Sequence, residues 1–285
     1  MIERDEELAE GVNLDPKTVR GFGEEWSLFD HTEKHDAEME RIWGAYFRIF
    51  PWQLTSKDSI GIDVGCGSGR WARFVAPKVG LLHCVDASVD ALKVASTNLA
   101  AFDNCRMHLA SVDRLPFADG SCDFAYSLGV LHHVPDTAAG IKAVAAKLKP
   151  NAPFLLYLYY AMENRPRWYR VVWRVSDVIR RLVARQNFTF RRMVAAVMAI
   201  TVYWPLARCS RVLESAGVDV DRIPLSAYRS RSFYVMRTDA LDRFGTRLEK
   251  RFTRDEIREM LVEAGFVDIQ FSDQRPFWLC VGRKA

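Results

Sequence analysis

The sequence predicts an α/β protein whose core is a parallel β-sheet with crossover helices. From residue 60 onward, apolar runs of strand length alternate with segments of helical periodicity, which is the pattern of successive β-α-β units. The chain of 285 residues is 49% hydrophobic and 27% charged, a composition that excludes disorder as the main state and allows a large buried core. No repeat with a period of roughly 20 to 50 residues is present, so a repeat architecture is excluded as well.

The first half of the predicted sheet has the order β-α-β-α-β. Strands are predicted at residues 60–64, 81–86 and 107–110, and helices at 70–78 and 89–101. Ser88 stands directly before the second helix, where its side chain can accept a hydrogen bond from a free backbone N–H group. Because helices connect these strands, we expect the strands to run parallel.

The second half of the sheet is predicted around a long interruption. Strands are predicted at 124–128, 154–160, 266–271 and 277–281, with helices at 137–148 and between Thr253 and Gly265. Thr253 and Glu256 have the spacing of a capping box, and Gly265 suits the left-handed residue that ends a helix. The last two strands are joined by a turn so short that they must pair antiparallel.

The chain divides into four predicted segments. They are an N-terminal helical lid (1–57), a core (58–160), a helical cap insertion (161–252) and a C-terminal helix with a strand hairpin (253–285). The N-terminal segment is rich in aromatic residues, and it serves either as a lid or as a helical layer that completes the core. The insertion has helical patterns at 168–185 and 191–215, followed by a less regular stretch through Tyr228 and Phe233.

Positive charge is concentrated in the insertion. Residues 161–251 contain 18 Arg and one Lys against eight Asp or Glu, a net charge of +11, whereas the rest of the chain carries −7 and the whole chain +4. An Arg-rich segment of this kind either faces an anionic group, such as phosphate, carboxylate, a lipid headgroup or nucleic acid, or is a solvated surface.

Cysteine spacing and hydropathy predict a cytoplasmic protein. The six cysteines include no C-x-x-C pair, so neither a metal knuckle nor a dense disulfide framework is expected. Residues 1–10 carry five acidic residues and no apolar run, unlike a signal peptide. The longest apolar stretch, 193–207, contains Pro205 and is shorter than the ~20 residues that cross a bilayer. We therefore expect no membrane-spanning helix.

A glycine-rich loop follows the first strand, with the sequence Asp63-Val64-Gly65-Cys66-Gly67-Ser68-Gly69. Glycines at alternate positions let the backbone turn tightly and approach a ligand closely. A dinucleotide-binding fingerprint needs a further glycine where this chain has Arg70, and a P-loop needs a Lys that is absent. A nicotinamide, flavin or nucleoside triphosphate site is therefore disfavoured.

Asp86 ends the next strand, 21 residues after Gly65. A carboxylate at this position can accept hydrogen bonds from both hydroxyls of a ribose that lies across the strand ends. The alternative is a structural anion at the start of the following helix. Together with the loop, Asp86 indicates a nucleoside without a pyrophosphate.

Four motifs in this order resemble a class I S-adenosylmethionine-dependent methyltransferase of the type 11-like, small-molecule subset. They are the glycine-rich loop, Asp86, the segment 111–123 and the segment 128–133. The resemblance covers about residues 58–160 strongly and 253–283 by layout. It implies a Rossmann-like, seven-stranded mixed sheet with helices on both faces and an antiparallel last strand, S-adenosylmethionine as the cofactor and no metal.

The resemblance also assigns the residues that contact the methionine part of the cofactor. Gly65, Cys66 and Gly67 would line it, Asp63 would reach its ammonium through water, and the Leu128 carbonyl would meet the same ammonium.

For the adenosine part, Asp86 and Ala87 would hold the ribose, and Ser111 and Val112 would flank the adenine. The family often has Asp where this chain has Ser111, so Asp113 is either the substitute contact to the adenine or a carboxylate that caps a turn.

The segment Phe22-Gly23-Glu24-Glu25-Trp26 resembles a box that precedes the sheet in some of these enzymes. Trp26 would cover the cofactor or, alternatively, is a core aromatic residue.

Two histidines follow the fourth predicted strand, where the methyl group would be presented. His132 and His133 are the candidate catalytic bases, with loop packing as the alternative role. The candidate acceptor contacts share a position near the fifth strand or in the insertion, and they are His133, Tyr160, Arg165, Tyr169, Tyr228 and Arg229. For Tyr228 and Arg229, a salt-bridge network inside the insertion is the alternative.

These observations predict methyl transfer to a small-molecule acceptor, at an oxygen of an anionic or aromatic metabolite. One alternative is a membrane-surface enzyme with a lipid-borne acceptor, because Arg191 and Arg192 precede the apolar run 194–204. An RNA-binding methyltransferase is the other. The near absence of Lys in the insertion and the apolar faces of its helices argue against nucleic acid as a partner.

Overall fold

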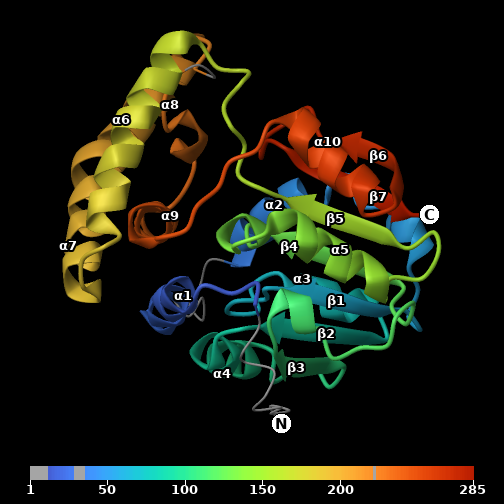
Figure 1. Ribbon diagram of the computed structural model, residues 1–285. Helices are drawn as coiled ribbons and strands as arrows, with labels where there is room; N and C mark the ends of the chain where they lie inside the picture. Colours follow the sequence, from blue (N-terminus) through green and yellow to red (C-terminus); the bar gives the residue numbers. More distant parts are fainter. Residues whose placement is uncertain (1–11, 29–35, 221–222) are drawn as a thin grey trace. The chain divides into compact units, whose positions relative to one another are not determined.

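A seven-stranded mixed sheet forms the centre of the computed structural model, which describes residues 12–28, 36–220 and 223–285 (Figure 1). The strand order is β3-β2-β1-β4-β5-β7-β6, and only the pairs that include β7 are antiparallel. The strands are β1 (Ile60–Val64), β2 (Leu81–Asp86), β3 (Cys105–Leu109), β4 (Phe124–Leu128), β5 (Pro153–Tyr157), β6 (Phe266–Phe271) and β7 (Leu279–Lys284). The predicted Rossmann-like sheet and its antiparallel last strand are confirmed.

Three strand boundaries differ from the prediction. β3 begins and ends slightly earlier than 107–110, and β7 runs from Leu279 to Lys284 rather than over 277–281. β5 ends at Tyr157, the last residue that pairs with β7, through Leu279. Tyr160 instead forms an isolated bridge with Phe252. The apolar character of 158–160 therefore reflects burial beside the sheet rather than continued strand pairing.

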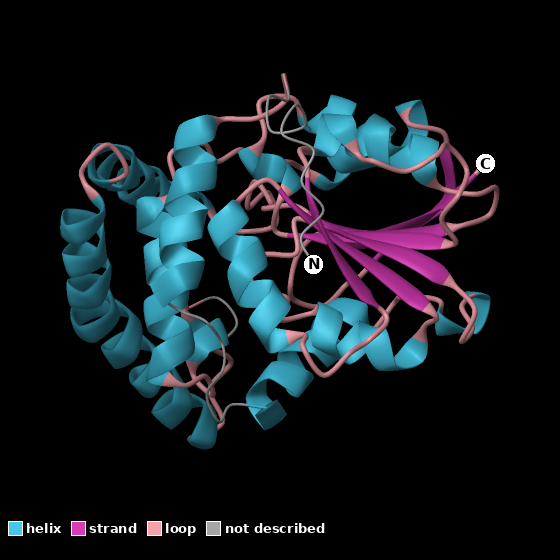
Figure 2. Ribbon diagram, turned by 90° about the horizontal axis from the view of Figure 1, so that it is seen from below, coloured by secondary structure: helices cyan, strands magenta, loops and turns pink. Residues whose placement is uncertain are grey.

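Helices cover both faces of the sheet, as Figure 2 shows. The helices that pack with it are α2 (Asp36–Phe47), α3 (Ala72–Val75), α4 (Val89–Asn98), α5 (Thr137–Lys147) and α10 (Arg254–Glu263). One buried cluster joins Ala125 and Phe154 of the sheet to α5 and α10, and the other joins Phe124 and Leu155 to α2, α3 and α4. Neighbouring residues of one strand thus enter opposite clusters, as the two-residue period of a strand requires.

Several predicted helix signals have the expected structural effect. Ser88 accepts a hydrogen bond from the N–H of Ala91 at the start of α4, and the capping box of Thr253 and Glu256 is formed at the start of α10. The predicted helix 70–78 is shorter, because α3 gives way to a 3₁₀ turn at Ala76–Lys78, where Pro77 has no backbone N–H to continue an α-helix.

The N-terminal segment contributes α1 (Pro16–Leu28) as well as α2. α1 packs against α4, and Gly23 of α1 lies so close to Ser88 that a Cβ atom there would be 2.6 Å from its hydroxyl oxygen. Parts of the predicted lid, 1–11 and 29–35, lie outside the described residues.

The chain separates into two compact units. The first contains the sheet and its helices, with the chain up to Ala161 and from Leu248 to Ala285, and the second contains Met162–Arg247. Leu248 to Phe252, predicted as part of the insertion, therefore belong with the sheet. The helices of the second unit are α6 (Arg167–Val183), α7 (Phe188–Met198), α8 (Trp204–Ser215) and α9 (Phe233–Gly245).

α9 was missed by the prediction of an irregular stretch through Phe233. Ser232 caps this helix by accepting a hydrogen bond from the N–H of Val235, and its buried apolar residues include Met236, Ala240 and Phe244. Their spacing of four residues is helical, so the signal was present in the sequence.

α7 and α8 form one continuous helix despite Pro205. A π-helical segment, Ala199–Tyr203, joins them, and Pro205 falls in the first turn of α8, where a proline is tolerated. Phe188–Ser215 is thus a helix of 28 residues that is long and apolar enough to cross a membrane by length and composition. The helix predicted at 191–215 therefore continues through Pro205 as expected, whereas the prediction that its apolar stretch is too short to cross a bilayer is wrong by length and composition.

Candidate functional site

The glycine-rich loop turns sharply at the carboxyl end of β1, at the point where the strand order changes between β1 and β4. Gly65, Gly67 and Gly69 all have positive φ angles of 77°, 54° and 75°. The N–H groups of Gly65 and Cys66 both donate to the Val85 carbonyl oxygen, at 2.8 and 2.9 Å. A Cβ atom at Gly65 would lie 2.3 Å from the Val130 side chain, so the loop has no room for a larger residue there. Open α/β sheets bind ligands outside the carboxyl ends of the strands at such a point.

Asp86 ties the loop to the end of β2. Its Oδ2 accepts a hydrogen bond from the Gly67 N–H at 2.9 Å, and its Oδ1 accepts one from the Ser88 N–H at 2.8 Å. Burial raises the pKa of this carboxyl group, and these two backbone hydrogen bonds counteract the rise. A carboxylate has two lone pairs on each oxygen, so Asp86 can still accept hydrogen bonds from a ligand. The structural role and the predicted ribose contact are compatible.

Asp63 lies directly under the loop and is almost completely buried. The hydroxyl of Tyr126 on β4 donates to its Oδ2 at 2.9 Å. Burial raises the pKa of Asp63 to about 8, although this hydrogen bond and Arg70 lower it in part. A cation bound nearby would favour the charged carboxylate. Tyr126 was not among the predicted site residues, because it lies 63 positions from Asp63 along the chain.

Cys66 lies within the loop and is buried. Its contact with Cys84 lowers the pKa of its thiol, but burial and the carboxylates of Asp86 and Asp63 raise that pKa to about 11. The thiol is therefore protonated at neutral pH, and Cys66 can contribute its backbone rather than a nucleophile.

Trp26 of α1 lies against the glycine-rich loop. A Cβ atom at Gly67 would be 3.0 Å from the indole of Trp26. The Arg70 guanidinium lies 5.0 Å from the centroid of the Trp26 ring and 4.6 Å from that of Trp71. Arg70 thus stacks between two indoles at the position where a dinucleotide site needs glycine. The indole of Trp26 is placed to cover the loop, and its contact with a cofactor stays a prediction.

Asp113 fastens the residues before α1 to the loop after β3. Its Oδ2 accepts from the N–H groups of Val12 and Asn13 at 2.9 and 3.3 Å, and its Oδ1 accepts from the Ser111 hydroxyl at 2.6 Å. Burial alone would raise the pKa of Asp113, but the hydrogen bonds from Ser111 and Asn13 lower it below its ordinary value. These contacts favour the structural alternative for Asp113. Ser111 and Val112 are buried beside it.

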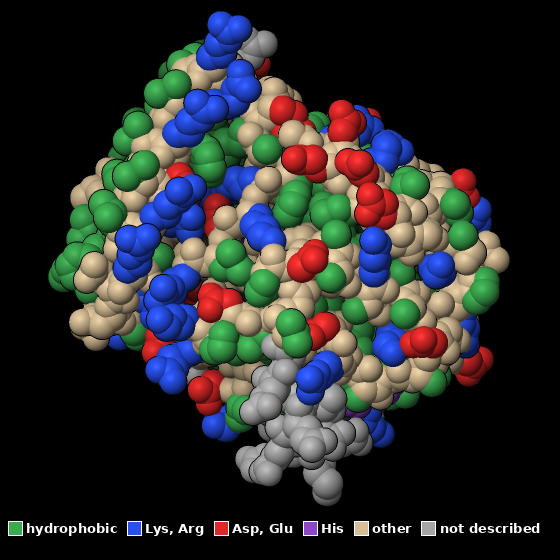
Figure 3. Space-filling view, viewed as in Figure 1, with side chains coloured by type: hydrophobic (Ala, Val, Ile, Leu, Met, Phe, Trp, Pro, Cys, Tyr) green, Lys and Arg blue, Asp and Glu red, His purple; other side chains and the backbone are tan. Residues whose placement is uncertain are grey.

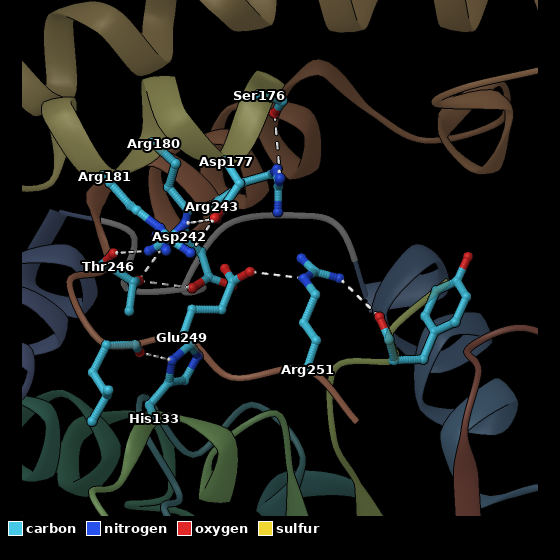
Figure 4. A network of polar contacts seen from close by, with 12 residues as sticks. His133, Ser176, Asp177, Arg180, Arg181, Asp242, Arg243, Thr246, Glu249 and Arg251 are labelled. Atoms are coloured by element: carbon cyan, nitrogen blue, oxygen red, sulfur yellow. Dashed lines mark hydrogen bonds and ion pairs between the residues drawn. The ribbon is translucent and has the colours of Figure 1, made fainter. Parts of the chain in front are cut away.

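His133 follows β4 and is held in one tautomer. Its Nδ1 lies 2.6 Å from the carbonyl oxygen of Leu248. Figure 4 marks this contact with a dashed line from His133. Since a carbonyl oxygen only accepts, Nδ1 must carry the proton, and Nε2 of the neutral ring carries a lone pair. The ring also packs against Phe22, 5.0 Å between centroids. A lone pair at Nε2 is what a general base requires.

His132 differs from His133. Its ring is fully buried against Tyr159, 3.9 Å between centroids, and against His133. Within the described residues neither of its ring nitrogens has a hydrogen-bond partner, and burial holds its pKa well below the ordinary value. His132 is therefore neutral, and of the two predicted bases His133 has the better geometry.

Arg251, which was not among the predicted site residues, contacts Glu249, Tyr159 and Tyr160 near the two histidines. Its Nε contacts Glu249 Oε1 at 2.9 Å (Figure 4). Its guanidinium lies 5.0 Å from the ring centroid of Tyr159. It also donates to the Tyr160 carbonyl oxygen at 3.3 Å. The ring of Tyr160 packs against Phe277 at 5.7 Å. The strand end after β5 and the segment before α10 are thus joined by one basic side chain.

The other predicted acceptor contacts lie in the second unit. The Arg165 guanidinium stacks on the Tyr169 ring, 5.5 Å from its centroid. The Tyr228 hydroxyl donates to Asp239 Oδ2 at 2.9 Å. Arg229 makes a two-pronged ion pair with Glu214, with both N–O distances 2.7 Å. Tyr228 and Arg229 are therefore engaged in the network inside the insertion that was the alternative. Among the described residues, no group of three or more His, Cys, Asp or Glu is arranged to hold a metal ion.

Comparison with known proteins bears on the first unit. Residues 62–156 match the family model of the methyltransferase domain. The chain is 32% identical over 105 residues to the uncharacterized methyltransferase YcgJ of Bacillus subtilis, covering 36% of this chain and 42% of that protein. It is 32% identical over 101 residues to phosphoethanolamine N-methyltransferase 2 of Caenorhabditis elegans, covering 34% of this chain and 23% of that enzyme. The matches thus span less than half of the length of these two relatives.

A solved structure shares the fold. A SAM-dependent methyltransferase of Methanosarcina mazei superposes with a TM-score of 0.50 at 17% identity, covering 83% of this chain and 98% of that one. At this identity the likeness concerns the fold alone.

Proposed function

Since the chain carries a class I S-adenosylmethionine-dependent methyltransferase domain, we propose that it transfers a methyl group from S-adenosylmethionine to an oxygen of a small-molecule acceptor. The observation that carries this proposal is the glycine-rich loop closed onto Asp86 at the point where the strand order changes. When bound, S-adenosylmethionine supplies a methyl group on a positively charged sulfur.

The residues around the loop fit this cofactor. Gly65 and Gly67 allow the positive φ angles by which the loop turns tightly at the end of β1. Asp86 and Ala87 hold the ribose, and Ser111 and Val112 flank the adenine. Asp63, buried beside the loop, reaches the ammonium through water, and that cation favours the charged form of its carboxyl group. The Leu128 carbonyl and the Trp26 indole complete the set that we assign to the cofactor.

His133 is the residue that we assign to proton removal from the acceptor. Its Nε2 lone pair is fixed by the hydrogen bond from Nδ1 to the Leu248 carbonyl. A hydroxyl acceptor must lose a proton when it takes up a methyl group, so a neutral imidazole suits an oxygen acceptor. The acceptor contacts that we keep from the sequence are Tyr160, Arg165 and Tyr169, with an anionic or aromatic metabolite as the expected class.

Calorimetry tests the cofactor assignment. We expect S-adenosylhomocysteine to bind the full chain with measurable heat and NADH to give none. Replacing Asp86 with Asn, which keeps the size of the side chain but removes its charge, should weaken S-adenosylhomocysteine binding by about tenfold, as for a charge-assisted hydrogen bond. Uptake of NADH without uptake of S-adenosylhomocysteine would overturn the proposal.

A pH profile tests the base. The change His133→Gln keeps a side-chain amide near the Leu248 carbonyl but removes the titrating group. It should lower kcat by about a hundredfold and abolish the acidic limb of the profile, measured with labelled methyl groups and a hydroxyl-bearing acceptor library. An unchanged profile would assign His133 to loop packing.

A second candidate function is methylation of a lipid-borne acceptor at a membrane surface. The apolar side chains exposed on α6 and on the helix Phe188–Ser215 favour it. RNA as a partner has less support, because the arginines of α6 border apolar side chains rather than aromatic platforms. We also propose a cytoplasmic location, which the six free cysteines support.

A further inference from the structure

Helix α6 exposes most of its large apolar side chains and buries an ion pair. The apolar side chains that are more than two-fifths exposed are Trp168, Val171, Val172, Val175, Val178, Ile179 and Leu182. They recur every three or four residues and so form one stripe along the helix, about 21 Å long at ~1.5 Å per residue. On another side of the same helix Asp177 and Arg180 are buried. An ordinary surface helix has the opposite distribution.

The helix formed by α7 and α8 repeats this arrangement beside α6. Its exposed apolar stripe is Phe190, Met193, Val197, Ile200 and Trp204, again with steps of three and four residues. Its buried residues include Ala195, Ala199 and Ala207, which are almost inaccessible, and Tyr203. α7 packs against both α6 and α9. We call the exposed apolar residues of α6, α7 and α8 named in these two paragraphs the apolar face of the insertion.

A row of arginines borders the apolar face. Arg167, Arg174 and Arg181 on α6 and Arg185 in the turn after it are all exposed. The first three are seven residues apart and so share one side of the helix, and each directly precedes a residue of the apolar stripe. Figure 3 shows basic side chains in a row beside hydrophobic ones on this helix. The unit 162–247 contains 17 Arg, no Lys and seven Asp or Glu, a net charge of +10.

We propose that the apolar face of the insertion docks on an anionic lipid bilayer, with α6, α7 and α8 lying in the plane of the headgroups. Apolar side chains would enter the acyl region, while the neighbouring arginines would pair with phosphate groups of the lipids. Trp168 and Trp204 belong to the stripes, and indoles favour this boundary because one edge is apolar and the other carries an N–H. This inference adds a docking surface to the second candidate function, methylation at a membrane surface. It rests on that function only for the claim that the acceptor is lipid-borne.

The contacts inside the unit favour an in-plane position over a spanning one. α8 includes Arg208, which donates to the backbone carbonyls of Arg229 and Arg231, and these contacts hold it against the rest of the unit. A spanning helix would have to carry this charge and its partners into the hydrocarbon core, at high cost. On α6 the exposed apolar side chains share one side, which suits a helix that lies at the interface.

Charge also favours lipid over a second copy of the chain. Two copies that met through this face would bring two arginine rows and two units of net charge +10 together. Repulsion between like charges opposes such a dimer, whereas an anionic bilayer neutralises them.

Co-sedimentation of the full chain with vesicles tests the docking. We expect binding to vesicles of equal parts phosphatidylglycerol and phosphatidylcholine, and little binding to phosphatidylcholine alone. The double change Val175→Asp with Ile179→Asp should lower the partition coefficient about a hundredfold, since it removes two apolar side chains from the bilayer. Replacing Arg167, Arg174 and Arg185 with Gln should lower it about fivefold for each arginine, and less at high salt.

A matched control introduces two aspartates at exposed apolar positions of the first unit. The double change Val262→Asp with Val267→Asp also removes two exposed apolar side chains, which lie on α10 and β6. This variant should sediment with vesicles like the unchanged chain. Equal losses in both double variants, or equal binding to the two kinds of vesicle, would overturn the proposal. So would a dimer in sedimentation velocity that becomes a monomer in the Val175→Asp, Ile179→Asp variant, because the face would then belong to a second copy.

Calorimetry with S-adenosylhomocysteine on the same variants separates this inference from the proposed function. Each variant should keep the S-adenosylhomocysteine affinity of the unchanged chain, since all substitutions lie outside the glycine-rich loop and its partners. A chain that binds vesicles but not S-adenosylhomocysteine would overturn the proposed function and leave the docking surface standing. The reverse result would overturn the docking surface alone.

Discussion

The two units of the chain differ in where their large apolar side chains lie. Strands β1, β4 and β5 of the first unit fill two clusters with apolar residues that are almost inaccessible, such as Ile62, Phe124 and Leu155. Of the described large apolar side chains that are exposed, 17 lie between 162 and 247 and four in the first unit. In the first unit burial of apolar surface accounts for the fold. In the insertion, apolar side chains remain exposed while the ion pair of Asp177 and Arg180 is buried. The insertion therefore keeps apolar surface for the lipid bilayer on which we propose that it docks.

The largest expected effect of a single change is at the glycine-rich loop. Gly65→Ala forces an L-residue to φ 77° and places its Cβ 2.3 Å from Val130. Strain and overpacking together should cost about 4 kcal/mol of unfolding free energy. S-adenosylhomocysteine binding should fall by more than a hundredfold, because the loop must move. Urea unfolding and calorimetry measure the two effects.

Gly217→Ala is the matched control in the insertion. Gly217 has φ 81°, but a Cβ atom there would have no heavy atom within 4 Å. The change should therefore cost only about 1 kcal/mol, the strain of the backbone angle itself. If both variants lost the same unfolding free energy, the close contact between Gly65 and Val130 would not contribute to the effect at Gly65.

The next effect concerns the buried ion pair of the insertion. Arg180 Nε lies 2.7 Å from Asp177 Oδ1, and Arg180 also donates to the Thr246 carbonyl oxygen at 2.8 Å (Figure 4). Asp177→Ala leaves a buried guanidinium without its carboxylate and should destabilise the insertion by about 3 kcal/mol. Hydrogen exchange should accelerate in α6 and α9, while S-adenosylhomocysteine affinity stays unchanged.

Arg181 also forms an ion pair with Asp177, but the Arg181 side chain is 68% exposed. The change Arg181→Ala removes this pair. A surface pair of this kind should cost less than about 1 kcal/mol. If both changes accelerated exchange equally, burial would not explain the stability of the insertion.

A smaller, pH-dependent effect is expected at Asp63 in the core. Its pKa is about 8 in the folded chain against 3.8 when exposed, so the folded state keeps a proton that the unfolded state has lost between these values. Stability should therefore fall as pH rises from about 4 to about 8. Asp63→Asn should remove this slope and be the more stable variant by about 2 kcal/mol at the upper end. Urea unfolding across this pH range measures the difference.

Asp58→Asn, at an exposed position just before β1, should leave the slope in place. At neutral pH, S-adenosylhomocysteine binding should also release a proton from Asp63, which appears as a dependence of the binding heat on the ionisation enthalpy of the buffer. A stability that rises toward pH 8 would contradict the raised pKa.

Much of the first unit could be predicted because local signals agree with burial there. β1, β2, β4 and β6 have the predicted boundaries, since each is a strand-length segment rich in apolar residues that ends at or just before glycine, aspartate or serine. The position of Asp86 beside Gly67 also follows from two parallel strands ending at one edge. The hydrogen bonds of Asp113 did not follow, because they join it to Val12 and Asn13 across about a hundred residues of chain.

In the insertion the sequence predicts helices but not their exposed sides. The spacing of Val171, Val175 and Val178 predicts an amphipathic helix, and such a stripe ordinarily faces a protein core. Here the stripe is exposed, and Arg180 is buried by its contacts with Asp177 and Thr246. Only the three-dimensional contacts distinguish the two cases, because the pattern along the chain is the same in both.

The smallest effect compares two tryptophans, one from each unit. Trp26 lies against Gly67 and Arg70, whereas Trp168 is 52% exposed on α6. If Trp26 covers the cofactor, Trp26→Leu should weaken S-adenosylhomocysteine binding about tenfold, the value of a lost aromatic contact. Ligand binding should also no longer quench the tryptophan fluorescence. Trp168→Leu should leave both unchanged, because its indole is assigned to the lipid surface. Equal affinities in the two variants would make Trp26 a core aromatic residue, and the cover of the glycine-rich loop would then have to come from another part of α1.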